Sequence, residues 1–154
     1  MNNDTAEQAF TRLGWAIDRR DWHAVRDVLA ATIAVDYTEL FGGEPASMSR
    51  EDLTEQWRAN LGRLDATQHV IANVQASVND DGTVHATANV VATHVRAGTA
   101  GTPIWTVGGW YDAQLSPSDD GYAISSLKLH PTWQTGNLAI MTALVHAGNA
   151  VLRI

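Results

Sequence analysis

Three ionisable side chains are placed along the chain so that they could share one acid–base site. Asp18 follows Ile17 in a segment whose apolar residues recur at helical spacing, which puts the carboxylate at the edge of the apolar face. His69 and His94 each lie near an end of a run with strand-like alternation. A helix packed across a sheet would bring the acid and the two imidazoles together. That convergence is our hypothesis.

A carboxylate and two imidazoles can move protons near neutral pH. An imidazole can act first as base and then as acid, and a carboxylate can fix the tautomer of a neighbouring imidazole and raise its pKa. Loss of water from a β-hydroxy carbonyl compound needs such a base, an acid for the leaving hydroxyl group and a donor for the enolate oxygen. We assign the base and acid roles to His69, and we predict a dyad between Asp18 and His94.

The same three residues have the composition of a metal site with two histidines and one carboxylate. No closely spaced ligand motif accompanies them, and the proton transfers need no metal ion. We therefore predict chemistry without a metal or an organic cofactor. A single strand histidine is most often a hydrogen-bonded structural residue, so the hypothesis depends on the set and not on one member.

The composition narrows the class of protein. The chain has 154 residues, a formal net charge of −7 and no cysteine. This length predicts one domain over residues 1–154. An acidic chain is a poor ligand for nucleic acid, and no apolar run is long enough to span a membrane. The polar beginning of the sequence and the missing cysteines favour a cytoplasmic protein.

The patterning places helices early in the chain and long strands later. Helices are expected at residues 6–20, 21–29 and 49–62, and strands at 32–40, 68–79, 83–96, 104–115 and 122–129. Asp4 or Thr5 can cap the first helix, and Ser49 opens the third with a capping-box pattern. Helices gathered on one face of a curved antiparallel sheet give an α+β cone. Its apolar interior is a natural pocket for a small-molecule substrate.

Residues 137–151 are expected to form a last helix that is apolar on more than one face. Such a helix has to be covered on both sides. It can close the mouth of the cone as a lid, or it can pack against another copy of the chain. We predict a homodimer or a homotrimer.

This arrangement resembles the SnoaL-like branch of the nuclear-transport-factor-2-like (NTF2-like) superfamily, and most of all the scytalone dehydratases. The residues that carry the resemblance extend over most of the chain, from Trp15 to Trp133. They are Asp18-Arg19-Arg20-Asp21-Trp22, Val35-Asp36-Tyr37, Thr67-Gln68-His69, His94 and Trp110-Tyr111. The resemblance implies a cone-shaped sheet around the N-terminal helices.

The resemblance also implies roles for single residues. Asp18, His69 and His94 match the family's acid–base set, and Tyr37 matches the second of its two pocket tyrosines, a donor to the substrate carbonyl. Ile17 stands where the family has its first pocket tyrosine. Val107 stands at a position where the family has an asparagine. These departures argue against scytalone itself as the substrate.

The implied activity is that of a cofactor-independent dehydratase acting on a small cyclic or polyketide-like hydroxy-ketone. An isomerase or cyclase with the same acid–base pair, and a non-catalytic ligand-binding cone, stay open as alternatives. We expect Ile17, Val107, Trp57 and Trp110 to contact the substrate. The sequence leaves open which side of the sheet His85 and Asp112 face.

Overall fold

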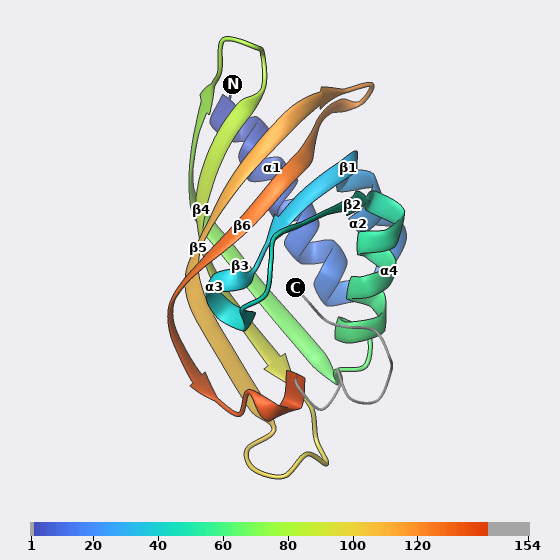
Figure 1. The fold of residues 1–154 in the computed structure, drawn as a ribbon, viewed down its shortest axis with the longest axis vertical. Coiled ribbons are helices and arrows are strands. Elements are labelled where there is room, and N and C mark those ends of the chain that lie inside the picture. Colours follow the sequence, from blue (N-terminus) through green and yellow to red (C-terminus); the bar gives the residue numbers. More distant parts are fainter. Residues whose placement is uncertain (1, 142–154) are drawn as a thin grey trace.

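The computed structural model describes residues 2–141, in which helices come first and a long meander of strands follows (Figure 1). The elements are α1 (Asn2–Arg19), α2 (Trp22–Val28), β1 (Leu29–Asp36), α3 (Thr38–Phe41), β2 (Ala46–Ser49), α4 (Arg50–Leu61), β3 (Ala66–Val78), β4 (Val84–Val95), β5 (Ile104–Ser118) and β6 (Gly121–Gly136).

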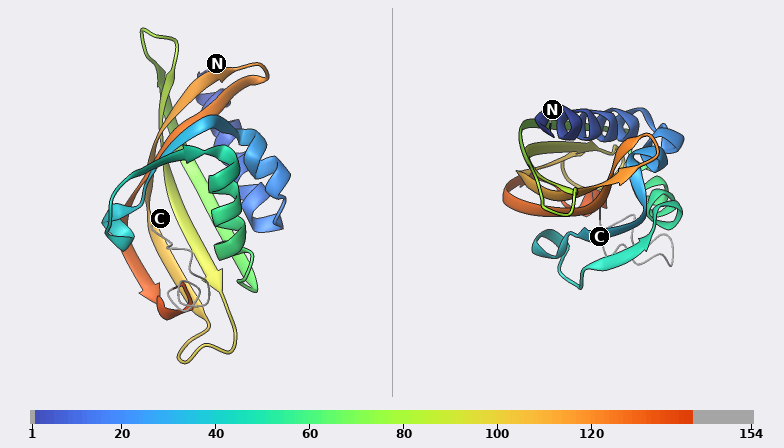
Figure 2. Two further views of the ribbon diagram at one scale, coloured as in Figure 1. Left: turned by 45° about the vertical axis from the view of Figure 1, so that its right-hand side comes forward. Right: turned by 90° about the horizontal axis from the view of Figure 1, so that it is seen from above.

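All six strands belong to one sheet, in the order β2-β1-β6-β5-β4-β3. The sheet curves without closing, and α1, α2 and α4 lie together on one side of it (Figure 2). The predicted α+β architecture is confirmed. The sheet is not wholly antiparallel, however, because β1 pairs with β6 in parallel. These two strands are separated by most of the chain and not by a hairpin, so nothing forces them to run in opposite directions.

The helices follow the patterns that predicted them. In α1 the side chains of Ala6, Phe10, Leu13 and Ile17 are buried at helical spacing. Ser49 caps α4, since its side chain accepts a hydrogen bond from the backbone N–H of Asp52 at 3.1 Å.

Two boundaries differ from the prediction at the beginning of the chain. The first helix begins at Asn2, so Asp4 and Thr5 lie inside its first turns and do not cap it. The second helix ends at Val28, and the strand that follows is β1, which begins at Leu29.

The strand expected at residues 32–40 ends at Asp36. The side chain of Asp36 accepts hydrogen bonds from the backbone N–H and the hydroxyl group of Thr38, at 3.0 and 2.7 Å, and this local turn starts the short helix α3. Tyr37 therefore lies between a strand and a helix.

The last strand reaches Gly136, beyond the predicted end at residue 129, because an irregularity opposite Gly108 and Gly109 lets β6 keep pairing with β5 past Pro131.

Most of the last helix predicted at residues 137–151 lies outside the described residues. The prediction that it forms a lid or an interface therefore also falls outside them. The described part stops at Met141, which is buried together with Ile140. Asn137 fastens this part to the β4–β5 loop, because its side-chain amide donates to the backbone oxygens of Ala100 and Thr102 at 2.8 and 3.0 Å. No helix within residues 2–141 is long and apolar enough to cross a membrane.

Candidate active site

Asp18 lies near the C-terminal end of α1 and binds the first part of β3. Its Oδ1 accepts hydrogen bonds from His69 Nδ1 at 2.7 Å and from Thr67 Oγ1 at 3.0 Å. Its Oδ2 accepts a hydrogen bond from the backbone N–H of His69 at 2.8 Å. Burial alone raises the pKa of Asp18, but these hydrogen bonds outweigh it and hold the pKa below its usual value. Asp18 is therefore a carboxylate at neutral pH.

An ionised carboxylate can only accept hydrogen bonds, so the contact at 2.7 Å places a proton on Nδ1 of His69. In the neutral ring the lone pair is then on Nε2. The side chain of His69 is 8% exposed, and the ring forms part of the wall of an interior cavity. The pair has the arrangement of a general base whose orientation is fixed by an acid.

The position of α1 against the edge of the sheet makes this contact possible. β3 is the last strand of the sheet, and α1 lies along it. Near the beginning of α1, Asn3 accepts a hydrogen bond from the backbone N–H of Ala76 at 2.7 Å. Near its end, Asp18 does the same for His69. Two side chains of one helix thus satisfy backbone groups of an edge strand, and the second of them also orients the imidazole.

The predicted dyad between Asp18 and His94 is wrong. Thr67 is the residue paired with His94, so His69 lies two residues farther along β3, on the edge strand that α1 covers. His94 is one strand farther from α1. Its ring lies edge-on to that of His69, with 5.8 Å between the ring centres, and 4.9 Å from the ring of Trp105.

His94 is held in its neutral form, which also contradicts the predicted rise in its pKa. Burial and the neighbouring His69 lower the pKa of His94 to about 4, against smaller opposing effects of the Trp105 backbone and the Asp18 carboxylate. Nδ1 of His94 is buried, and no described residue forms a hydrogen bond with it. A ligand in the cavity can reach a histidine that carries no charge.

The cavity has a volume of about 60 Å³ and lies between the helices and the sheet. The wall that residues 2–141 form is mostly apolar, and besides two tryptophans its polar side chains are two histidines and two tyrosines. The lining residues are Leu13, Ile17, Tyr37, Leu40, Phe41, Trp57, Leu61, His69, Ala92, His94, Trp105, Val107, Tyr111, Leu127, Leu129 and Met141. His69, His94, Tyr37, Ile17, Val107 and Trp57 are thus brought together as expected, and Asp18 stands behind His69.

Trp110 does not line the cavity, so its predicted substrate contact is wrong. Residues with odd numbers, such as Trp105 and Val107, face inward along β5, and Trp110 therefore faces outward. Its ring stacks on His130 at 4.0 Å on the outer side of the sheet. The next residue, Tyr111, faces the cavity instead. The buried Trp105 fixes this phase, and the same alternation in the sequence could have identified Tyr111, which the sequence analysis missed.

The hydroxyl groups of Tyr37 and Tyr111 lie close enough for each to affect the pKa of the other. Burial raises the pKa of Tyr111 to about 12 and that of Tyr37 well above its usual value. Both hydroxyl groups keep their protons at neutral pH, and each can donate a hydrogen bond. Tyr111 thus gives the cavity a second phenol, although Ile17 occupies the position at which the resemblance places the first pocket tyrosine.

His85 and Asp112 form a second histidine–carboxylate pair, with 2.9 Å between Nε2 and Oδ1. Their side chains are 38% and 40% exposed on the outer face of the sheet, away from the cavity. Within residues 2–141 no group of three or more histidine, aspartate or glutamate side chains is arranged to hold a metal ion.

The SnoaL-like domain pattern matches residues 4–128. This chain belongs to the SnoaL-like family. The family is part of the NTF2-like superfamily, as the resemblance had indicated. No curated protein matches the chain at a significant level.

Solved structures share the fold of this SnoaL-like chain. The Kfla4162 protein from Kribbella flavida is 26% identical, with a TM-score of 0.81 over 88% of this chain and 93% of that one. A candidate aromatic ring hydroxylase from Novosphingobium aromaticivorans is 17% identical, with a TM-score of 0.78 over 91% and 96%. A candidate scytalone dehydratase from the same species is 15% identical, with a TM-score of 0.73 over 86% and 85%. The last two likenesses show the fold alone.

The lowered pKa of His94 predicts that stability depends on pH between about 4 and 6.5. In this range the unfolded chain binds a proton at His94 and the folded chain does not, so the free energy of unfolding decreases as the pH falls. Going from about pH 7 to about pH 5 should remove about 2 kcal/mol through this group. Urea unfolding of the original chain and of His94→Gln at both pH values measures the difference.

The His94→Gln variant should lose about 2 kcal/mol less over this interval than the original chain. His23→Gln, at an exposed position on α2, is the control and should lose as much as the original chain. Equal losses in all three proteins would contradict a low pKa at His94.

Proposed function

We propose that this chain is a cofactor-independent lyase of the dehydratase type, which removes water from a small cyclic or polyketide-like hydroxy-ketone. The observation that carries the proposal is the Asp18–His69 pair. The carboxylate holds the proton of the imidazole on Nδ1, and the ring borders an apolar cavity. Such a pair is suited to abstracting a proton from carbon, because Asp18 stabilises the imidazolium ion that forms.

The reaction uses His69 twice. Nε2 takes the proton from the carbon next to the substrate carbonyl, and the electron pair of that C–H bond moves toward the carbonyl to form an enolate. The enolate then expels the β-hydroxyl group, which receives the proton from Nε2–H and leaves as water. The products are an unsaturated ketone and a neutral His69.

Three neutral groups take part by hydrogen bonding. Tyr37, supported by Tyr111, donates to the carbonyl oxygen on which negative charge develops. This role needs protonated phenols, which the raised pKa values of both tyrosines provide. His94 contributes a hydrogen bond and no charge, because its pKa of about 4 keeps it neutral. The unpartnered Nδ1 of His94 supports a direct contact with the substrate.

The charges around the cavity favour an uncharged substrate. Among residues 2–141, the lining includes no lysine or arginine. A carboxylate or phosphate group in this cavity would therefore lack a cation, and burying an unpaired charge is costly. The carboxylate of Asp18 already accepts three hydrogen bonds from Thr67 and His69, which stabilise its negative charge without a substrate.

Isomerisation or cyclisation is the second candidate activity, because both can begin with the same proton abstraction by His69. The fate of the proton separates the activities. In the dehydratase it leaves with the hydroxyl group as water, and in an isomerase it returns to carbon. The apolar wall also supports the binding of a small molecule without reaction, and the next experiment distinguishes this case.

His69→Gln and Asp18→Asn should each lower the turnover of β-hydroxy ketones by about a hundredfold or more, the usual contribution of a general base. His85→Gln is the matched control, because it disrupts a histidine–carboxylate pair of similar geometry outside the cavity. The measurement is the appearance of the unsaturated ketone by its ultraviolet absorbance. Equal turnover in all three variants would contradict the assignment, and ligand binding without turnover in the original chain would favour a binding protein.

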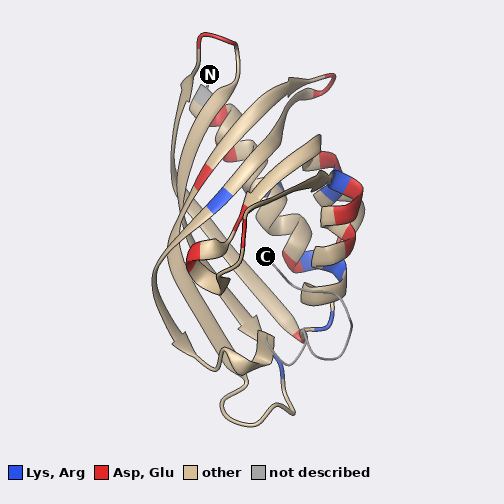
Figure 3. Cartoon of the chain, viewed as in Figure 1, with Lys and Arg blue, Asp and Glu red and all other residues tan. Residues whose placement is uncertain are grey.

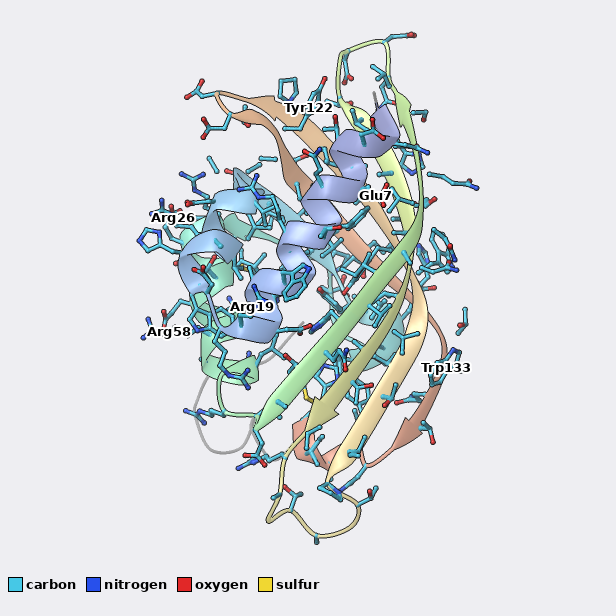
Figure 4. The ribbon with its side chains drawn as sticks, turned by 180° about the vertical axis from the view of Figure 1, so that it is seen from behind. Glu7, Arg19, Arg26, Arg58, Tyr122 and Trp133 are labelled. Carbon is cyan, nitrogen blue, oxygen red and sulfur yellow. The ribbon has the colours of Figure 1, made fainter. Side chains whose placement is uncertain are left out.

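We also propose that copies of the chain associate through the outer face of the sheet. Val70, Val91, Gly108 and Trp133 lie side by side in register across four strands. Val70, Val91 and Trp133 are 53%, 38% and 48% exposed, and Trp133 points away from the helices (Figure 4). The sheet around this row is almost free of charged residues (Figure 3). Two copies with a net charge of −7 can meet there without bringing like charges into contact.

Sedimentation at micromolar concentration should show a dimer or trimer for the original chain and a monomer for Val91→Lys, which places a charge in the middle of the row. Val78→Lys is the control, because Val78 is also exposed but lies at the far end of β3. A monomeric original chain, or an unchanged assembly in Val91→Lys, would contradict this interface.

A further inference from the structure

The short helix α3 supplies a part of the cavity wall, and its residues Leu40 and Phe41 pack against the hydrophobic core. Tyr37, Leu40 and Phe41 all line the cavity, yet none of the residues of α3 is fully buried. The backbone oxygen of Tyr37 accepts hydrogen bonds from the N–H groups of Leu40 and Phe41, both at 3.0 Å. Tyr37 and the helix are therefore one unit, and a displacement of α3 displaces the backbone of Tyr37.

The outer side of this unit is held by two basic residues of β6. Oε2 of Glu39 lies 2.6 Å from Nδ1 of His130 and 4.0 Å from Nζ of Lys128. Lys128 also lies 3.4 Å from Oδ2 of Asp36. The ring of His130 is itself fixed, because it stacks on Trp110 with 15° between the ring planes. We call the contacts of Glu39 with His130 and Lys128 the Glu39 clamp.

The other end of α3 leads into two glycines. Gly42 and Gly43 follow the helix with φ angles of 72° and 83°, which favour glycine. Apart from their chain neighbours, no atom of residues 2–141 lies within 4 Å of the position where a Cβ atom of either residue would be. These two exposed residues can change conformation without disturbing a packed neighbour, so they form a suitable hinge.

A ring-shaped ligand needs more space than the cavity offers. A cavity of about 150 Å³ accommodates benzene, whereas this one measures about 60 Å³. The other walls are held more firmly. Asn3 and Asp18 fasten α1 to β3, and the long strands are hydrogen-bonded along their length. Of the described walls, α3 is the one that combines an adjacent hinge with a single outer clamp.

We propose that Glu39 is a positioning residue whose clamp on β6 holds α3, and with it Tyr37, against the cavity, and that α3 is the wall that opens to admit a ligand. Release of Glu39 frees α3 to turn about the two glycines. The effect on catalysis rests on the proposed function, because it acts through the Tyr37 hydroxyl group. The opening itself does not depend on any reaction.

Hydrogen exchange followed by NMR tests the clamp directly. In Glu39→Ala, the amide protons of Leu40, Phe41 and Gly42 should exchange at least tenfold faster, because their hydrogen bonds belong to α3. The amide proton of Ala113 in β5 should be unaffected. Glu44→Ala, which removes an exposed acid from the loop after α3, is the matched control and should leave all four rates unchanged. Unchanged exchange in Glu39→Ala, or faster exchange throughout the protein, would overturn the proposal.

Binding of an uncharged cyclic ketone such as 2-tetralone provides a second readout. The cavity contains Trp57 and Trp105, so stopped-flow tryptophan fluorescence can follow its association. Association should be several-fold faster in Glu39→Ala than in Glu44→Ala or the original chain, and equal rates would contradict α3 as the entrance. Neither experiment needs turnover. If the chain converts no hydroxy-ketone, the proposed dehydratase function is refuted. The role of the Glu39 clamp is then decided by hydrogen exchange and ligand association alone.

Discussion

The hydrogen bonds between Asp18 and the segment from Thr67 to His69 connect the fold of this protein to its chemistry. One carboxylate accepts the backbone N–H of an edge strand, the hydroxyl group of Thr67 and the Nδ1 proton of His69. The first contact helps to fasten α1 to the sheet, and the last fixes the proton on the imidazole. A substitution of Asp18 therefore disturbs an anchor and a base together. A matched loss of stability and activity is a physical consequence of this arrangement.

The remaining polar groups of the cavity are kept neutral by burial. His94 loses its proton above about pH 4, and the two tyrosines keep theirs. The cavity thus combines one charged pair, formed by Asp18 with His69 when the ring is protonated, with neutral donors and an apolar wall. This contrast suits a reaction in which charge forms briefly and then disappears, because the neutral groups can stabilise the enolate without binding an anion strongly in the ground state.

Periodicity in the sequence was enough to place α1, α4 and the long strands, since their apolar residues recur at spacings of a helix or a strand. The resemblance then selected Asp18, His69, His94 and Tyr37 for a common pocket. The partner of Asp18 could not be predicted in this way. It depends on which strand lies at the edge of the sheet beneath α1, and strand order is a tertiary property. The same is true of β2, whose four residues form a strand only because β1 lies beside them. Trp110 was misplaced for a different reason, because the choice between Trp110 and Tyr111 depends on the phase of the alternation.

The tautomer of His69 is the central claim, and an NMR spectrum that correlates the ring nitrogens with the ring protons measures it most directly. When the His69 ring is neutral, its proton should be on Nδ1, with the strongly deshielded signal of a short hydrogen bond to Asp18, and Nε2 should be unprotonated. A proton on Nε2, or a ring that averages between the two tautomers like free imidazole, would contradict it.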